Sequence, residues 1–227
     1  MLKFHKKGYC LIFGSISYLN LLPFQIYIKK SISNTQLKQI INYKKATPSS
    51  INKEFKNRRV DAAFISSIKS RGCKCTNLGI VSNGAVYSVL VLPYEQSFDI
   101  ESDTSNALST LLDIKGKVII GDKALKYYLE NKESNFIDLS KAWNDKTKLP
   151  FVFARLCYNK HGKKIKRLAK KFKGKREKIP YYYLKKAANK KGLSATNLKW
   201  YLNYIDYHLK YKEKRALKLF LKRAKSV

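Results

Sequence analysis

The chain has 227 residues, of which 44% are hydrophobic, with ten glycines and five prolines. This composition is typical of a globular protein with one large domain or two smaller lobes, and it excludes collagen-like and disordered chains. The 48 lysines and arginines outnumber the 15 acids and give a formal net charge of +33.

An excess of this size suggests nucleic acid, an anionic membrane or an anionic substrate as partner. Residues 158–227 hold 24 of the 48 basic side chains. Lysine dominates over arginine, whereas arginine supplies the planar, bidentate recognition of phosphates and bases. We therefore expect no nucleic-acid partner, and a basic nucleic-acid-binding protein stays the weaker alternative.

The N-terminus resembles a signal peptide only superficially. Polar residues such as Ser15, Ser17 and Asn20 interrupt its apolar stretch, and no small-x-small cleavage pattern follows. No run of about 18 apolar residues is present, so we expect no membrane span. The sequence therefore predicts a cytoplasmic protein.

The four cysteines are too few and too scattered for a disulfide framework, which favours free thiols in a reducing compartment. They are Cys10, Cys73, Cys75 and Cys157. Cys73 and Cys75 could form half of a metal site, but no second pair completes it, so we expect no metal and no cofactor.

The first elements alternate strand and helix. Residues 9–16 are typical of a buried strand, and residues 17–30 of a polar loop that leads into a helix. Residues 48–60 predict a helix that begins at Pro48 and Ser49 or Ser50. A strand follows over 60–66, and Ser66 and Ser67 mark its end.

The same alternation continues through the middle of the chain. Residues 78–93 predict one or two strands around Asn83-Gly84. A helix capped by Asp103 or Thr104 comes next, then a strand over 117–120 that runs into Gly121, Asp122 and a helix. Residues 149–158 form a later apolar strand, and 194–209 and 213–224 predict two amphipathic helices.

Alternating strands and helices predict a parallel sheet, whose ligands lie beyond the carboxyl ends of the strands. Ser, Thr, Asn, Asp and Gly cluster at those ends in this chain. Any one of them is more simply a helix cap or turn residue. Five such junctions together favour a ligand site.

Seven segments, in this order and spacing, resemble the chorismate dehydratase family of menaquinone biosynthesis. They cover nearly the whole chain and read GSISYLNLLPF, VDAAFISSI, GAVYSVLVL, SDTSNAL, IIGDKAL, DLSKAWNDKTKLPFVFA and YLNYIDYHL followed by ALKLF. The resemblance implies dehydration of chorismate to 3-[(1-carboxyvinyl)oxy]benzoate in the futalosine route to menaquinone. A related enzyme of that route, the dihydroxynaphthoate synthase, shares the fold but differs in the opening motif.

The resemblance also implies an α/β fold similar to type II periplasmic binding proteins, with a cleft between two lobes and a helical C-terminus. Residues 87–93 and 149–156 would be the crossing strands. Lobe one would hold residues 1–92 and 158–227, and lobe two residues 93–157. Lobe two would be small, because a stretch that relatives carry before residue 117 is nearly absent.

Chorismate is a dicarboxylate, so we expect helix N-termini and small hydroxyls around it. By resemblance, Asn20 is the active-site asparagine that orients substrate and stabilises the enolate-like intermediate. A neutral amide is too weak a base to take the proton, so the base is a substrate carboxylate or Asp122, which reads equally well as a helix cap. The predicted substrate-binding residues are Ser17, Ser66, Ser67, Gly84, Thr104, Ser105 and Phe151.

Several questions stay open at this point. His5, His161 and His208 fall outside every motif, so none is expected to be catalytic. A non-enzymatic binder of a small carboxylate is the main alternative, because the two-lobed fold serves capture as well as catalysis. Either reading predicts lobe closure by a hinge at the crossing strands, in a monomer or a homodimer.

Overall fold

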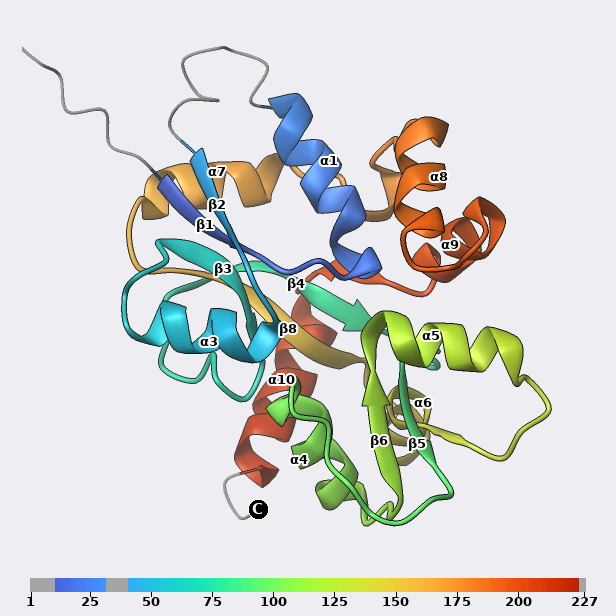
Figure 1. The fold of residues 1–227 in the computed structure, drawn as a ribbon. Coiled ribbons are helices and arrows are strands. Elements are labelled where there is room, and N and C mark those ends of the chain that lie inside the picture. The colour runs from blue at the N-terminus through green and yellow to red at the C-terminus, as the bar shows by residue number, and fades with distance from the viewer. Residues whose placement is uncertain (1–10, 32–40, 225–227) are drawn as a thin grey trace, which may run out of the picture.

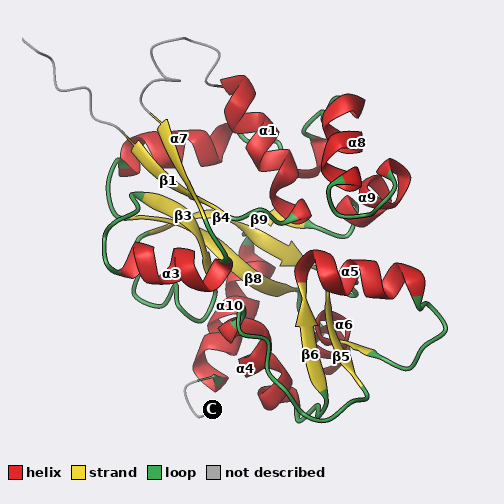
Figure 2. Cartoon of the chain, in the orientation of Figure 1, coloured by secondary structure: helices red, strands yellow, loops and turns green. Residues whose placement is uncertain are grey.

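The computed structural model describes residues 11–31 and 41–224, and its strands form two sheets, one in each of two lobes (Figure 1). The strands of the larger lobe pair in the order β2-β1-β3-β8-β4-β9, and those of the smaller lobe in the order β6-β5-β7. Figure 2 shows helices around both sheets. The predicted two-lobed α/β class is therefore confirmed.

The larger lobe takes both the N-terminal and the C-terminal parts of the chain. Its elements are β1 (Leu11–Ser15), the 3-10 turn η1 (Leu19–Leu21), α1 (Leu22–Ser31), β2 (Ile41–Lys45), α3 (Pro48–Lys56), β3 (Ala62–Ser66), β4 (Cys75–Ser82), β8 (Phe151–Tyr158), α7 (Gly162–Lys171), the 3-10 turn η2 (Gly174–Arg176), α8 (Tyr181–Asn189), α9 (Ala195–Leu202), β9 (Asp206–His208) and α10 (Tyr211–Arg223). The predicted helical C-terminus is thus present.

The smaller lobe is one continuous segment. Its elements are β5 (Val89–Leu92), α4 (Asp103–Leu112), β6 (Lys117–Ile120), α5 (Gly121–Glu130), β7 (Ile137–Asp138) and α6 (Leu139–Thr147). Of the two predicted crossing strands, β5 pairs in the smaller sheet and β8 in the larger one. The lobe boundaries stay a prediction, and strand membership favours placing them near 83–88 and 149–150.

The prediction of a parallel sheet is correct for only part of the larger lobe. β1 pairs in parallel with β2 and β3, whereas β8 is antiparallel to β3 and β4, and β9 is antiparallel to β4. The described strands of the smaller sheet pair in antiparallel fashion. The reason is the route of the chain: β8 returns from the smaller lobe and enters the larger sheet in the opposite direction.

Helices cover both faces of the larger sheet, with α1 and α7 on one face and α3 and α10 on the other (Figure 1). Phe24 of α1 packs edge to face against Phe64 and Phe172, and these three side chains are buried. On the opposite face, Phe220 of α10 packs against Phe151. Apolar burial of this kind holds the helices on the sheet. None of the described helices is long and apolar enough to cross a bilayer.

Two helix boundaries differ from the sequence prediction. The N-cap of α4 is Ser102, whose hydroxyl accepts a hydrogen bond from the Ser105 amide. The helix therefore begins slightly earlier than predicted, since the expected cap is Asp103 or Thr104. The helix predicted over 194–209 ends at Leu202, and Asp206–His208 forms β9 instead. Ile205 fits the helical spacing and is fully buried, but it lies in the turn between α9 and β9 rather than on a helix, because tertiary packing overrides local pattern.

The expectation of free thiols is wrong for two cysteines. Cys75 and Cys157 are bonded as a disulfide, whereas Cys73 is free. They are 82 residues apart in sequence but face each other directly on β4 and β8. Sequence spacing cannot reveal a cross-strand pair of this kind, because sheet register decides it. Cys10 lies outside the described residues.

Candidate functional site

A small cavity of about 90 Å³ lies where the two lobes meet. Residues at the ends of β1, β3 and β8 line it from the larger lobe, and residues of β5, β6 and α4 from the smaller one. Its polar lining consists of Tyr18, Asn20, Ser66, Ser88, Glu101, Ser102 and Ser105. Apolar residues such as Phe64, Ile80 and Phe153 complete the wall, so the few polar groups have fixed places in a mostly apolar surface.

Asn20 lies on η1, in the loop between β1 and α1. Its backbone carbonyl accepts a hydrogen bond from the Tyr207 hydroxyl at 2.7 Å. Its side chain lies near the hydroxyl of Tyr201, which donates to Ser88 at 2.9 Å. Burial raises the pKa of the Tyr201 phenol, while its contacts with Ser88 and Asn20 act in the opposite direction. The C-terminal part of the chain therefore holds the loop that carries Asn20.

Tyr18 joins the two lobes across the cavity. Its hydroxyl donates to the Glu101 carboxylate, and burial followed by this bond raises the pKa of the phenol well above its usual value. The ring lies against Gly121 at the start of α5, where an added Cβ would sit 2.8 Å from Cζ of Tyr18. Gly121 also has a φ of +67°, a conformation that favours glycine. A glycine is thus required at this strand–helix junction.

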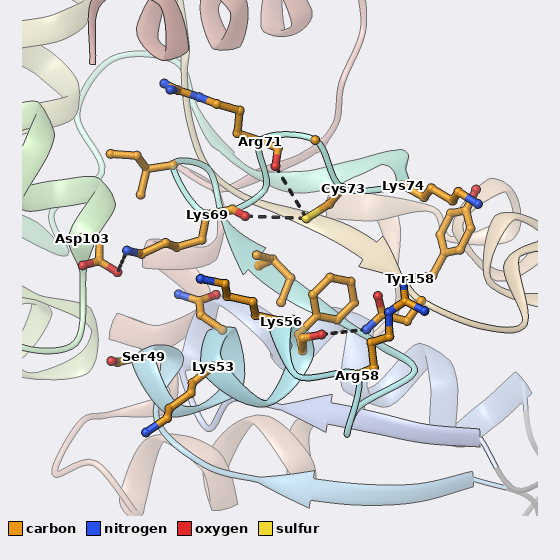
Figure 3. A pocket seen from close by; sticks show the side chains of 16 residues that line it. Ser49, Lys53, Lys56, Arg58, Lys69, Arg71, Cys73, Lys74, Asp103 and Tyr158 are labelled. Atoms are coloured by element: carbon orange, nitrogen blue, oxygen red, sulfur yellow. Dashed lines mark hydrogen bonds and ion pairs between the residues drawn. The ribbon is translucent and has the colours of Figure 1, made fainter. Parts of the chain in front are cut away.

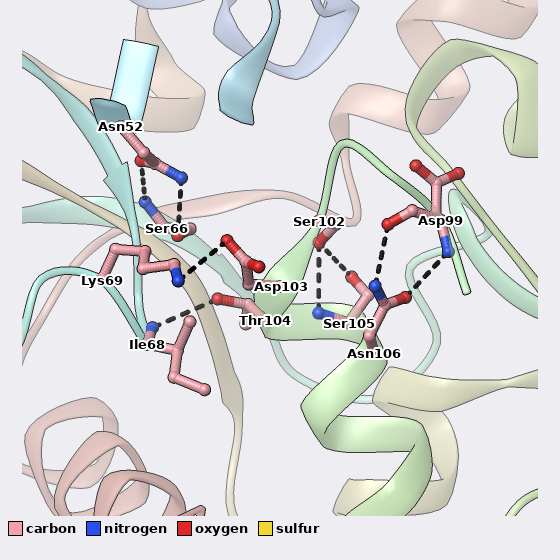
Figure 4. Close-up of polar contacts among 10 residues, drawn as sticks. All are labelled: Asn52, Ser66, Ile68, Lys69, Asp99, Ser102, Asp103, Thr104, Ser105 and Asn106. Atoms are coloured by element: carbon pink, nitrogen blue, oxygen red, sulfur yellow. Dashed lines mark hydrogen bonds and ion pairs between the residues drawn. The ribbon is translucent and has the colours of Figure 1, made fainter. Parts of the chain in front are cut away.

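The N-terminus of α4 faces the cavity through Ser102 and Ser105. The Ser105 amide donates to the Ser102 hydroxyl at 3.1 Å, and the two hydroxyls lie 2.8 Å apart (Figure 4). A ten-residue helix presents partial positive charge at this end, which favours a carboxylate nearby. Of the predicted substrate-binding serines, Ser105 therefore lines the cavity, and Ser66 lines it from β3.

The other predicted substrate-binding residues lie outside the cavity lining. The Ser67 hydroxyl is fully buried and donates to the Val152 carbonyl, and Thr104 accepts from the Ile68 amide at 3.2 Å. Phe151 is buried against Trp143 and Phe220. These contacts give all three side chains a packing or bridging role.

The remaining three predicted residues, Ser17, Gly84 and Asp122, also lie outside the cavity lining. Ser17 is exposed, and Gly84 has a positive φ in the turn after β4 with open space around it. Asp122, the candidate base, accepts from the Leu19 amide at 3.0 Å and pairs with Lys191 at 2.8 Å. Its carboxylate thereby links α5 to the larger lobe. Substrate binding by these residues, and catalysis by Asp122, stay predictions without support from this geometry.

Sequence reasoning missed four polar residues that line the cavity: Tyr18, Ser88, Glu101 and Ser102. Tyr18 and Ser102 lie inside the motifs GSISYLNLLPF and SDTSNAL, close to the predicted residues Ser17 and Thr104. Ser88 lies in a strand-like run, and Glu101 in an irregular segment with no periodic pattern. His161 and His208 lie outside the lining, and His5 is outside the described residues. Within the described ranges, no three potential metal ligands cluster.

Comparisons with known proteins point to one family. Residues 100–226 match the family model described as menaquinone biosynthesis. The chain is 46% identical over 221 residues to the chorismate dehydratase of Campylobacter jejuni, an alignment that covers 96% of this chain and 99% of the relative.

Solved structures support the fold alone. A protein from Archaeoglobus fulgidus superposes with a TM-score of 0.68 at 12% identity, covering 97% of this chain and 98% of that one. The periplasmic aliphatic sulphonate binding protein SsuA of Escherichia coli gives 0.54 at 12% identity, covering 96% and 86%. The expected periplasmic-binding-protein-like fold is confirmed. With nearly full-length identity to a curated member and a matching family model over more than half its residues, this chain belongs to the menaquinone biosynthesis family that includes chorismate dehydratase.

Proposed function

We propose that this protein is a chorismate dehydratase, a hydro-lyase that removes water from chorismate to give 3-[(1-carboxyvinyl)oxy]benzoate in menaquinone biosynthesis. The observation that carries the proposal is the 46% identity to a chorismate dehydratase over nearly the whole of both chains. The cavity is compatible with it, because small hydroxyls, an amide and a helix N-terminus line it, and these groups suit a carboxylate ligand.

The reaction removes a ring proton and the ring hydroxyl and leaves an aromatic ring. The proton passes to a base, the carbon–oxygen bond breaks, and the hydroxide leaves with a proton as water. The gain of aromaticity favours the product, so the protein has chiefly to position the substrate and stabilise developing negative charge. Asn20 suits this role, because it lines the cavity and its side chain lies near the buried Tyr201.

The contacts of the two nearby acids bear on which group acts as the base. Asp122 is occupied by the Leu19 amide and Lys191, outside the cavity lining. Glu101 lines the cavity but accepts from Tyr18. These contacts favour a carboxylate of the substrate itself as the base. Ser102 and Ser105, at the start of α4, would hold the other carboxylate.

The cavity of about 90 Å³ is smaller than the 300–1,000 Å³ usual for ligand sites. The lobes therefore have to part before a molecule of this size can bind. We expect closure afterwards, by a hinge near residues 83–88 and 149–150, which excludes water from the reacting groups.

The test is to incubate the purified protein with chorismate and to follow loss of the diene absorbance, with the product identified by mass spectrometry. We expect wild type to convert chorismate and Asn20→Ala to lose at least 100-fold in kcat, the size expected for one charge-stabilising donor. Asn77→Ala is the matched control, because Asn77 is exposed on β4 and outside the cavity lining. No turnover by wild type would refute the function, and a fully active Asn20→Ala would refute the assigned role.

A further inference from the structure

A second hollow, much larger than the cavity, lies on the α3 face of the larger lobe. Its volume is about 860 Å³, and it runs between α3 and the turn that follows β3 (Figure 3). Six basic side chains line it, namely Lys53, Lys56, Arg58, Lys69, Arg71 and Lys74. We call this hollow the basic groove. Asp103 is the one acid in its lining.

Most of the positive charge of the basic groove is uncompensated. Lys69 pairs with Asp103 at 3.5 Å, and Arg71 donates to the Leu221 carbonyl. Within the described residues, Lys53, Lys56 and Lys74 make neither an ion pair nor a side-chain hydrogen bond. Lysine is common over the whole surface, but a concave, low-dielectric wall focuses the potential of one sign where a flat surface does not.

The basic groove and the cavity are neighbours along three chain segments. Pro48 lines the cavity and Ser49 the basic groove. Ser66 lines the cavity, and Ile65 and Ile68 the basic groove. At α4, Ser102 and Ser105 face the cavity, whereas Asp103 faces the basic groove. The two spaces therefore lie on opposite sides of one thin partition.

Figure 4 shows polar contacts that lie in this partition. Asn52 and Ser66 form a double hydrogen bond within the larger lobe, at 2.9 and 3.1 Å. Between the lobes, the Ile68 amide donates to Thr104 at 3.2 Å and Lys69 pairs with Asp103. Both partners of that ion pair are about half exposed, so its net contribution is small. This seam can open at low cost.

We propose that the basic groove is the capture site and access route of the dianionic substrate, and that parting of the Ile68–Thr104 and Lys69–Asp103 seam joins it to the cavity. The inference rests on the proposed function, since it names the path to that same site. Each lysine attracts a small dicarboxylate electrostatically without holding it tightly, because the lysine side chains are flexible and solvated point charges. Once Lys69 is released from Asp103, its positive charge also becomes available to the substrate, on the side of the basic groove nearest the cavity.

The test reverses charge in the basic groove and compares it with an equal reversal elsewhere. Lys53→Glu/Lys56→Glu changes two exposed, unpaired lysines of α3, and Lys185→Glu/Lys186→Glu changes two exposed lysines of α8, on the far side of the larger lobe (Figure 1). Both variants change the net charge by the same amount. Lys53→Gln/Lys56→Gln is a milder variant in case the glutamates disturb the end of α3, and circular dichroism checks the fold.

We expect kcat/KM for chorismate at low ionic strength to fall about tenfold in the α3 glutamate variant and about threefold in the glutamine variant, with kcat unchanged. The decrease of kcat/KM with added salt should also become less steep, because fewer charges attract the substrate. The α8 variant should behave like wild type. Equal effects of both glutamate variants, or no effect in the α3 variants, would overturn the access route. The proposed function would still stand in that case, as long as wild type converted chorismate. A wild type without turnover would overturn both.

Discussion

Replacement of Tyr201 by Phe removes a single oxygen atom that supports two cavity residues. The Tyr201 hydroxyl donates to Ser88 at 2.9 Å and lies near the Asn20 side chain. Tyr201 is 2% exposed and Ser88 is 3% exposed, so bulk solvent does not reach Ser88 to replace the hydroxyl that the substitution removes. The ring and its packing stay, which confines the change to the hydrogen bonds.

The magnitude follows from the burial of these groups. A buried polar group left without its partner costs about 1–3 kcal/mol, so Tyr201→Phe should lower the free energy of unfolding by that amount. The Asn20 amide loses the contact that fixes its orientation. We therefore expect kcat to fall by about 10- to 100-fold, as for a positioning contact, with a smaller change in KM.

Tyr27→Phe is the matched control. Tyr27 is also buried, and its hydroxyl donates to the Leu168 carbonyl at 2.9 Å, remote from the cavity lining. Urea denaturation should show similar losses of stability in both variants, and chorismate turnover should fall only in Tyr201→Phe. If both variants kept full kcat, or if both lost the same factor, the positioning of Asn20 by Tyr201 would be refuted.

Two further substitutions test the junctions between the lobes. Gly121→Ala places a Cβ 2.8 Å from the Tyr18 ring at a φ of +67°, so we expect Tyr18 to be displaced and turnover to fall at least tenfold. Gly192→Ala is the control for backbone strain alone, because Gly192 also has a positive φ and an added Cβ there meets only the flexible end of Lys126, at 3.6 Å. Equal activity of the two variants would contradict this. Asp138→Asn removes one of two carboxylate oxygens that together accept from the amides of Val86, Tyr87, Ser140 and Lys141, so urea denaturation should show a loss of about 2–4 kcal/mol, and a loss under 1 kcal/mol would contradict the role of this carboxylate.

The sequence was sufficient to place the polar junctions but not to tell which hydroxyls face a ligand. Ser66 is the last residue of β3 and Ser67 begins the turn after it, so these adjacent serines have different surroundings, and only Ser66 lines the cavity. Thr104 and Ser105 are likewise adjacent on a helix, about 100° apart in direction. The choice within each pair depends on register and rotation, which the pattern of polar residues leaves open.

Long-range contacts explain the other differences. Tyr201 fits an apolar helical face in sequence, and it is indeed buried, yet its hydroxyl reaches Ser88, 113 residues earlier in the chain. Asp122 reads as a base or a cap, and its partner Lys191 comes from the segment between α8 and α9. The pairing of Cys75 with Cys157 depends on the return of β8 into the larger sheet. None of these partners has a signal in local spacing.

The contacts between the lobes are unequal on the two sides of the cavity, and this inequality indicates where it opens. On the α5 side, Asp122 joins Leu19 and Lys191, and the Tyr128 ring stacks on Trp200 with centroids 5.8 Å apart. On the α4 side, the polar contacts are the Ile68–Thr104 bond, the exposed Lys69–Asp103 ion pair and, directly before the helix, the Tyr18–Glu101 hydrogen bond. An ion pair with a mostly buried carboxylate and a pair of stacked aromatic rings cost more to separate than an exposed ion pair.

We therefore expect parting on the α4 side, where the Tyr18–Glu101 bond separates together with the seam, while the α5 side stays close to the hinge residues through Tyr87, which packs against Tyr128 and Trp200. An opening there leads into the basic groove, since Asp103 lines its inner end. The side that opens most easily is thus the side where the potential attracts a dianion most strongly. Asp103→Asn should accordingly raise the rate of substrate association, by weakening the seam and by removing the one acid from the lining. A slower association in stopped-flow tryptophan fluorescence would place the opening on the other side.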